Sequence, residues 1–344
     1  MLSPITKSRL RKFRSIKRAW WSFCILTAAF VISLFSEQIA NDHPLLLRSD
    51  GHWYFPTVKF YSGQTFGGPY RTEADYLAMR TDPDFANKHG GWMLLPPIPH
   101  DPLHSYLDLA GNPPYPPSWR HWLGTDSSGR DVLTRLIYGF RICMIFALSL
   151  TAISVALGIL IGAVQGYFAG RVDLTIQRLI EIWSALPLLY IVILFGSIYG
   201  QTFTILLFVM ALFEWIALSY YVRGEVYKLR EQPYVLAARA LGQGNTYILL
   251  RQILPNAMTP VITLLPFMVV SGISALTALD FLGFGLQPPT PSWGEMIQDG
   301  LANVQAPWLA ASAVGALFLT LLLASFVGEG LRDAFDPKTH ARLQ

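Results

Sequence analysis

The stretch YVLAARALGQGNTYILLRQILPN (Tyr234–Asn256) decides how the chain is organised, because it lies between two long apolar runs and differs from both. It is too short and too polar to cross a bilayer. Small residues recur in its first half, and Gly242 can end a short helix and turn the chain. Pro255 then limits how far the next helix extends backwards. From physics alone, a helix lying on lipid headgroups and a helix that another backbone approaches closely are equally open interpretations.

The composition makes a soluble globular protein a poor interpretation. Hydrophobic residues make up 52% of the 344 residues, charged residues only 14%, and the mean hydropathy is +0.38. The basic residues are not interleaved with aromatic ones, so nucleic-acid binding is not indicated. Cys24 and Cys143 both stand in apolar runs, which predicts neither a disulfide framework nor a metal cluster.

Six apolar runs have about the length of a membrane span, roughly 20 residues. They cover residues 19–40, 140–168, 174–199, 202–222, 258–279 and 308–328. The first run follows a basic N-terminus, residues 1–18, and a signal peptide is the alternative to an uncleaved helix there. Residues 41–139 are polar, and their proline pairs predict an extended path rather than an independent domain. The remaining divisions are a core at 140–332, a polar loop at 223–256 and a tail at 333–344.

The basic residues predict which side of the membrane each loop faces. Five Lys or Arg residues lie in 223–251, whereas residues 281–306 contain none. Seven more lie between Lys7 and Arg18 with no acidic residue among them. By the positive-inside rule, both termini and the 223–256 loop are cytoplasmic and residues 41–139 are outside.

Three motifs resemble the C-type membrane subunits of dipeptide and oligopeptide ABC importers. The first is Ala237-Ala238, followed by Gly242 and then by Leu254-Pro255. The second is WLGTDSSGRDVLTRLIYGFRI (Trp122–Ile142), and the third is DFLGFGLQPPTPSWGEMI (Asp280–Ile297). Two further stretches, NDHPLLLRSDGHWYFP (Asn41–Pro56) and FGGP (Phe66–Pro69), resemble the Yej-type branch of that family, associated with peptide and microcin C import.

The resemblance implies an all-α integral membrane protein with six transmembrane helices. The fold would be the type I ABC importer transmembrane domain, with an enlarged periplasmic segment after the first helix. Such a subunit forms half of a pore for short peptides, including peptide-like antibiotics such as microcin C, in a bacterial inner membrane. It implies as partners a second homologous permease subunit in a heterodimer, ABC ATPase subunits that bind the ATP, a periplasmic substrate-binding protein and membrane lipid. The residues that match the family's ATPase-coupling loop are Ala237, Ala238, Arg239, Leu241, Gly242, Leu254 and Pro255.

No catalytic motif occurs, and no cofactor or metal site is expected, because the seven His residues show no ligand spacing along a helix. Charges within spans are costly and often functional, which makes Glu214 a candidate for the translocation path. Asp280, with Phe281 and Gly283, is a candidate for the pore mouth, where the acid could attract cationic peptides. Capping of a turn or pairing with an arginine is the alternative for Asp280.

The group Arg130, Asp131 and Arg135 has the spacing of one or two helical turns and predicts a salt-bridged external helix that caps the bundle. Other cargoes of the same family, namely nickel, opines or glutathione, remain open. A stand-alone secondary transporter using Glu214 and Asp280 is a second class of function. A membrane-anchored enzyme is a third, disfavoured because residues 41–139 lack a nucleophile or metal set.

Overall fold

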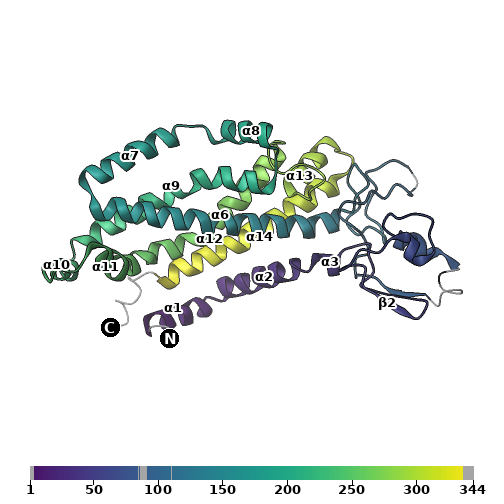
Figure 1. The fold of residues 1–344 in the computed structure, drawn as a ribbon, viewed down its shortest axis with the longest axis horizontal. Helices are drawn as coiled ribbons and strands as arrows, with labels where there is room; N and C mark the ends of the chain where they lie inside the picture. The colour runs from purple at the N-terminus through teal and green to yellow at the C-terminus, as the bar shows by residue number, and fades with distance from the viewer. Residues whose placement is uncertain (1–3, 84, 86–90, 110, 336–344) are drawn as a thin grey trace. The chain divides into compact units, whose positions relative to one another are not determined.

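The structure, a computed structural model, describes residues 4–83, 85, 91–109 and 111–335 and is mainly helical (Figure 1). Residues 1–3 of the basic N-terminus and 336–344 of the expected tail lie outside the described part. The chain divides into two compact units, residues 1–27, 143–287 and 317–344 and residues 28–142 and 288–316. The long helices are α1 (Pro4–Ser15), α2 (Lys17–Ser33), α6 (Val132–Phe168), α7 (Gly170–Ser184), α8 (Leu188–Tyr199), α9 (Phe203–Arg230), α12 (Leu254–Phe281) and α14 (Pro307–Phe335).

Among the described residues, four to six segments can cross a membrane. The helices α6, α9 and α14 qualify alone, as does the run Asn245–Phe281 that ends in α12. Two bent pairs, α1–α2 (95° bend) and α7–α8 (69° bend), bring the total to six if each is one span. The α7–α8 break falls at Pro187, which has no N–H to continue a helix. Six spans were predicted, but the observed helices end at different residues from the predicted runs. The first predicted run extends to residue 40, whereas α2 ends at Ser33 and is followed by the short helix α3 (Ser36–Ile39).

In the first unit, α6 and α9 approach closely along a line of glycines. A Cβ atom at Gly162 would lie 2.5 Å from the backbone oxygen of Ser219, and one at Gly166 would lie 2.7 Å from that of Arg223. Gly158 continues the line one turn earlier. Small residues at this spacing allow backbone contact between membrane helices, where van der Waals packing replaces the hydrophobic effect. The two spans therefore form a tight pair that carries the polar loop at its end.

The second unit contains a small antiparallel sheet that the sequence analysis did not predict. Its strands are β1 (Leu46–Ser49), β2 (His52–Tyr54) and β3 (Trp92–Leu94), in the order β2-β1-β3. The turn at Asp50-Gly51 has positive φ at both residues, which suits a two-residue hairpin. A hydrophobic cluster around buried Leu47 supports the sheet, with η1 (Gly63–Phe66) and α4 (Tyr76–Thr81) beside it. The extended path was therefore the wrong expectation for residues 46–94, whereas the described residues from 95 to 131 form only turns and isolated bridges.

The start of α6 packs against α13 (Trp293–Ala302) within the second unit. Trp293 is 1% exposed, and its indole N–H donates to the backbone oxygen of Leu136 at 3.1 Å. Gly139 faces the same indole, because a Cβ there would lie 2.8 Å from the ring. Trp308, at the start of α14, donates to the Thr125 carbonyl at 3.2 Å. These contacts hold the start of α6 against α13, and the loop before α6 against the start of α14.

Candidate functional site

The loop between α9 and α12 contains the short helix α10 (Pro233–Ala240), which begins with Pro233 and ends at a glycine turn. Gly242 has φ +75°, the left-handed conformation that glycine adopts at low cost. Its N–H donates to the Arg239 carbonyl, and the N–H of Gln243 donates to the Ala238 carbonyl at 3.1 Å. This pair of hydrogen bonds is the Schellman motif, which satisfies the last carbonyls of a helix. The predicted end of the helix at Gly242 is thus confirmed.

One face of α10 is buried and the other is open. Val235 and Ala238 pack into a hydrophobic cluster with residues of α6, α9 and α12, and Ala238 is 4% exposed. Ala237, by contrast, is exposed. Adjacent helical positions point about 100° apart, so the two alanines lie on different faces of α10. Of the two, Ala237 is the one on the exposed face.

The open side of the loop is apolar as well as exposed. Leu241 is 80% exposed, and three other large apolar side chains in 234–250 are at least 45% exposed, namely Leu236, Tyr247 and Leu250. Arg239 is exposed, Leu254 is half-buried, and Pro255 is exposed in the first turn of α12. Exposed apolar surface of this extent indicates an interaction site.

The part of the loop after Gly242 is held to the membrane helices. It forms α11 (Asn245–Tyr247) and a π-helical segment, η2 (Ile248–Ile253), that continues into α12. The hydroxyl of Tyr167 on α6 donates to the Asn245 side chain at 2.8 Å. Ile248 and Ile253 are completely buried. The loop is therefore joined to α12 by continuous helical backbone and to α6 by this hydrogen bond. Figure 1 shows α10 and α11 at one end of the helices of the first unit.

A buried acid near this end escaped the sequence analysis. Asp173 of α7 accepts hydrogen bonds from Arg223, at 2.7 Å, and from the Tyr227 hydroxyl, both on α9. The carboxylate is almost fully buried, whereas Arg223 is partly exposed. The pairs are 50 and 54 positions apart, so no local spacing could have indicated them. This cluster joins the first half of the bent span to the helix that leads into the loop.

The candidates for the translocation path differ in their surroundings. Glu214, in the middle of α9, is half-buried and makes no side-chain hydrogen bond or ion pair with another described residue. Asp280 is 4% exposed, and its carboxylate accepts the Leu286 N–H at 2.7 Å. A Cβ at Gly285 would overlap this carboxylate, so the turn closes over it. Gly283 is exposed with φ +77°, and Phe281 is half-buried. The geometry favours the capping role of Asp280, whereas Glu214 has no comparable partner among the described residues.

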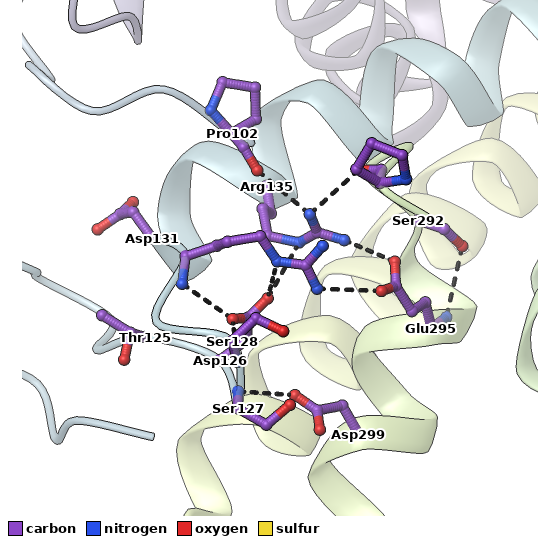
Figure 2. A network of polar contacts seen from close by, with 12 residues as sticks. Pro102, Thr125, Asp126, Ser127, Ser128, Asp131, Arg135, Ser292, Glu295 and Asp299 are labelled. Atoms are coloured by element: carbon purple, nitrogen blue, oxygen red, sulfur yellow. Dashed lines mark hydrogen bonds and ion pairs between the residues drawn. The ribbon is translucent and has the colours of Figure 1, made fainter. Parts of the chain in front are cut away.

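In the second unit, two carboxylates and two guanidinium groups form a closed cluster (Figure 2). Asp126 accepts from Arg130 at 2.7 Å, and Glu295 of α13 accepts from Arg130 at 3.1 Å and from Arg135 at 2.6 Å. Arg135 is completely buried and also donates to the carbonyls of Pro102 and Pro289. Burial alone lowers the pKa of Arg130, but the two carboxylates more than offset this and raise it, so the group stays charged.

The cluster replaces the external helix predicted from the spacing of Arg130, Asp131 and Arg135. Residues 126–131 form a loop, and the helix begins only at Val132. Asp131 does not pair with either arginine; it accepts the Thr134 N–H at 2.8 Å and so caps the helix. Both arginines bind Glu295 instead, which is 160 or more positions away. The structural role was predicted, but the partner and the local fold were not.

Among the described residues, a single group of side chains could share a metal ion: His100, His121 and Asp131. All three lie in the second unit, away from the loop described above in sequence.

Comparison with known proteins gives a family match and relatives along nearly the whole chain. Residues 154–341 match the family of binding-protein-dependent transport system inner membrane components. The inner membrane ABC transporter permease protein YejE of Escherichia coli is 46% identical over 98% of both chains. The peptidoglycan transport system permease protein YejE of Agrobacterium fabrum is 41% identical over 98% of this chain and 94% of its own. The oligopeptide transport system permease protein OppC of Haemophilus influenzae is 37% identical over 63% of this chain and 70% of its own.

Proposed function

Since the chain belongs to the family of binding-protein-dependent transport system inner membrane components, we propose that it forms half of the pore of an ATP-driven importer of short peptides. Members of this family are membrane permease subunits and not enzymes. The observation that carries the peptide cargo is the similarity along 98% of the chain to ABC permeases, together with the peptide permeases among the relatives. Peptide-like antibiotics such as microcin C are included in the proposed cargo class.

The proposed mechanism is alternating access driven by the partner ATPases. Closure of the ATPase subunits on ATP moves α10, whose exposed face docks on them through Leu241 and Ala237. The movement reaches α12 through the buried η2 segment and α6 through the Tyr167–Asn245 hydrogen bond. The spans then tilt and change the side to which the pore opens. The chain supplies geometry, and ATP is bound by its partners.

The pore needs a second permease subunit, because one chain offers only half of the wall. We assign this place to a homologous subunit in a heterodimer. Glu214 supports the assignment, since a half-buried carboxyl without a partner among the described residues is costly within a span and is expected to face a polar path. A substrate-binding protein on the outer side and ABC ATPases on the inner side complete the assembly.

The topology can be tested by cysteine labelling. In a background with Cys24 and Cys143 replaced by serine, single cysteines at Asp50 and Gln298, both exposed, are expected to react with an impermeant maleimide added to spheroplasts. A cysteine at Leu241, which is 80% exposed, is expected to react only after the membrane is opened. The physical reason is the excess of Lys and Arg near Leu241 and their absence from 281–306. Labelling of Leu241→Cys in intact spheroplasts would show the orientation to be reversed.

The cargo can be tested by uptake in cells that lack this chain. Uptake of a radiolabelled tripeptide is expected to fall to the background level and to return when the wild-type chain is supplied. Nickel ions and glutathione serve as competing cargoes in the same cells. If their uptake fell and that of the peptide did not, the peptide assignment would be wrong. Uptake that survives depletion of ATP would instead point to a secondary transporter.

A further inference from the structure

Two histidine rings lie buried against each other in the second unit. His121 is completely buried and His100 is 6% exposed. Their centroids are 4.4 Å apart with the rings inclined by 27°. Neither ring belongs to a helix or a strand, and the pair stands between the irregular stretch after β3 and the start of α6. Buried polar groups are normally hydrogen-bonded, so each of the four ring nitrogens is expected to have a partner.

The neighbours of each ring determine which nitrogen carries the proton. Nδ1 of His121 lies 2.9 Å from the carboxylate of Asp131, and Nε2 of His100 lies 2.7 Å from the backbone oxygen of Arg120. Neither the carboxylate nor the carbonyl oxygen has a proton to donate, so each of these nitrogens is the N–H donor of its ring. The opposite nitrogens, Nε2 of His121 and Nδ1 of His100, therefore carry free lone pairs in the neutral rings. Both are buried and have no hydrogen-bond partner among the described residues.

We propose that the two free nitrogens, Nδ1 of His100 and Nε2 of His121, bind a divalent transition-metal ion, with Asp131 as the carboxylate that orients His121 and with Zn²⁺ as the probe. Histidines that ligate metals donate their other N–H to a carboxylate or a backbone carbonyl, which is the arrangement of both rings here. One ligand atom of each residue lies within 4.8 Å of the others. Tetrahedral Zn²⁺ with bonds near 2.1 Å holds its ligand atoms about 3.4 Å apart, so ligand atoms that start up to 4.8 Å apart close by up to about 1.4 Å on binding.

The surroundings provide access and a counter-charge. A cavity of about 620 Å³ is lined by His100 and Asp131 and by residues such as Trp119 and Trp122. Water from this cavity completes the coordination of the ion, as in open metal sites. The nearby guanidinium of Arg120 is paired with Asp108 at 2.8 Å, and the Asp131 carboxylate, through its hydrogen bond to His121, supplies the negative charge beside the site.

An ion at this position joins two parts of the second unit. Asp131 caps α6 through the Thr134 N–H, whereas His100 lies 31 positions earlier in the chain. The ion would close that loop onto the first turn of α6 and stabilise the fold of the stretch from 100 to 131. No metal site was expected from the sequence, because His100 and His121 are 21 positions apart and do not share a helix.

The test is metal binding by the full-length chain purified with a tag that contains no histidine. After treatment with EDTA and reloading with Zn²⁺, the wild-type chain is expected to retain about one ion after desalting. The variants His100→Ala and His121→Ala are expected to lose it, and Asp131→Asn is expected to weaken Zn²⁺ binding about 10- to 100-fold. His52→Ala is the matched control, because His52 is exposed and hydrogen-bonds only locally, to the Asp50 carbonyl. Co²⁺ in place of Zn²⁺ reports the geometry through its visible absorption.

A second measurement uses the wild-type chain alone, so that a folding defect of the variants does not decide the outcome. Zn²⁺ is expected to raise the apparent melting temperature of the EDTA-treated protein, and EDTA to reverse the rise. Tightly retained Zn²⁺ that is equal in His52→Ala and lost in His121→Ala supports the site. The proposal is overturned if the folded wild-type chain retains no Zn²⁺, in which case buried water satisfies the two nitrogens. Equal retention by the double variant His100→Ala/His121→Ala overturns it as well.

Discussion

Replacing Gly242 with aspartate is expected to abolish peptide uptake while leaving the chain in the membrane at its normal abundance. In the chain itself, a Cβ at Gly242 would meet no atom within 4 Å, so the substitution causes no clash and only the cost of a left-handed residue. That cost is about 1–2 kcal/mol, and aspartate is among the residues that tolerate this conformation best. On docking, however, the added charge would be buried against the ATPase at a cost of several kcal/mol. Every 1.4 kcal/mol lowers the occupancy of the coupled state about tenfold.

Gly67 supplies a matched control for this substitution. It also has a left-handed backbone, φ +81°, with no atom within 4 Å of its Cβ position, but it belongs to the second unit. Gly67→Asp introduces the same strain and the same charge and is expected to keep uptake near the wild-type rate. Both variants are measured for membrane abundance, for uptake of a labelled tripeptide and for ATP hydrolysis stimulated by substrate. Normal coupled hydrolysis in Gly242→Asp would show that the loop does not transmit the ATPase movement.

The features that could be predicted from the sequence are those that depend on neighbours along the chain. The spans follow from continuous apolar runs, and the end of α10 follows from the left-handed turn at Gly242. The break at Pro187 likewise has a local cause, although its 69° bend was not predicted. In each case a single residue or a run of residues determines the backbone, whatever the rest of the molecule does.

The features that were missed depend on packing between distant segments. The opposite roles of Ala237 and Ala238 arise because the core formed by α6, α9 and α12 lies on one side of α10. The pairs Asp173–Arg223 and Arg135–Glu295 join residues 50 and 160 positions apart. The small sheet was missed because its strands have only three or four residues each, too short for an alternating pattern to stand out.

Replacing Glu295 with glutamine is expected to destabilise the second unit strongly. The cluster of Asp126, Glu295, Arg130 and Arg135 is electrically balanced, and the guanidinium of Arg135 is completely buried. Glutamine keeps the shape and one acceptor oxygen but removes the charge that both arginines share. Breaking a buried ion pair in this way costs about 3–5 kcal/mol, because the remaining charge is left without compensation. The measurement is the apparent melting temperature of the purified chain in detergent, with membrane abundance as a second readout.

The exposed pair Arg120–Asp108, in the same unit and outside the spans, is the matched control, because its groups are also in direct contact, at 2.8 Å. Its side chains are 48% and 57% exposed, so water already screens both charges and Asp108→Asn is expected to cost less than about 1 kcal/mol. A further variant, Arg130→Gln/Glu295→Gln, restores the balance of charge and is expected to recover part of the lost stability. Equal melting temperatures for Glu295→Gln and Asp108→Asn would refute the stabilising role of the cluster. The double variant restores electrical neutrality to the cluster. If it is nevertheless less stable than Glu295→Gln alone, the hydrogen bonds of the cluster stabilise the loop before α6, and its charge balance does not.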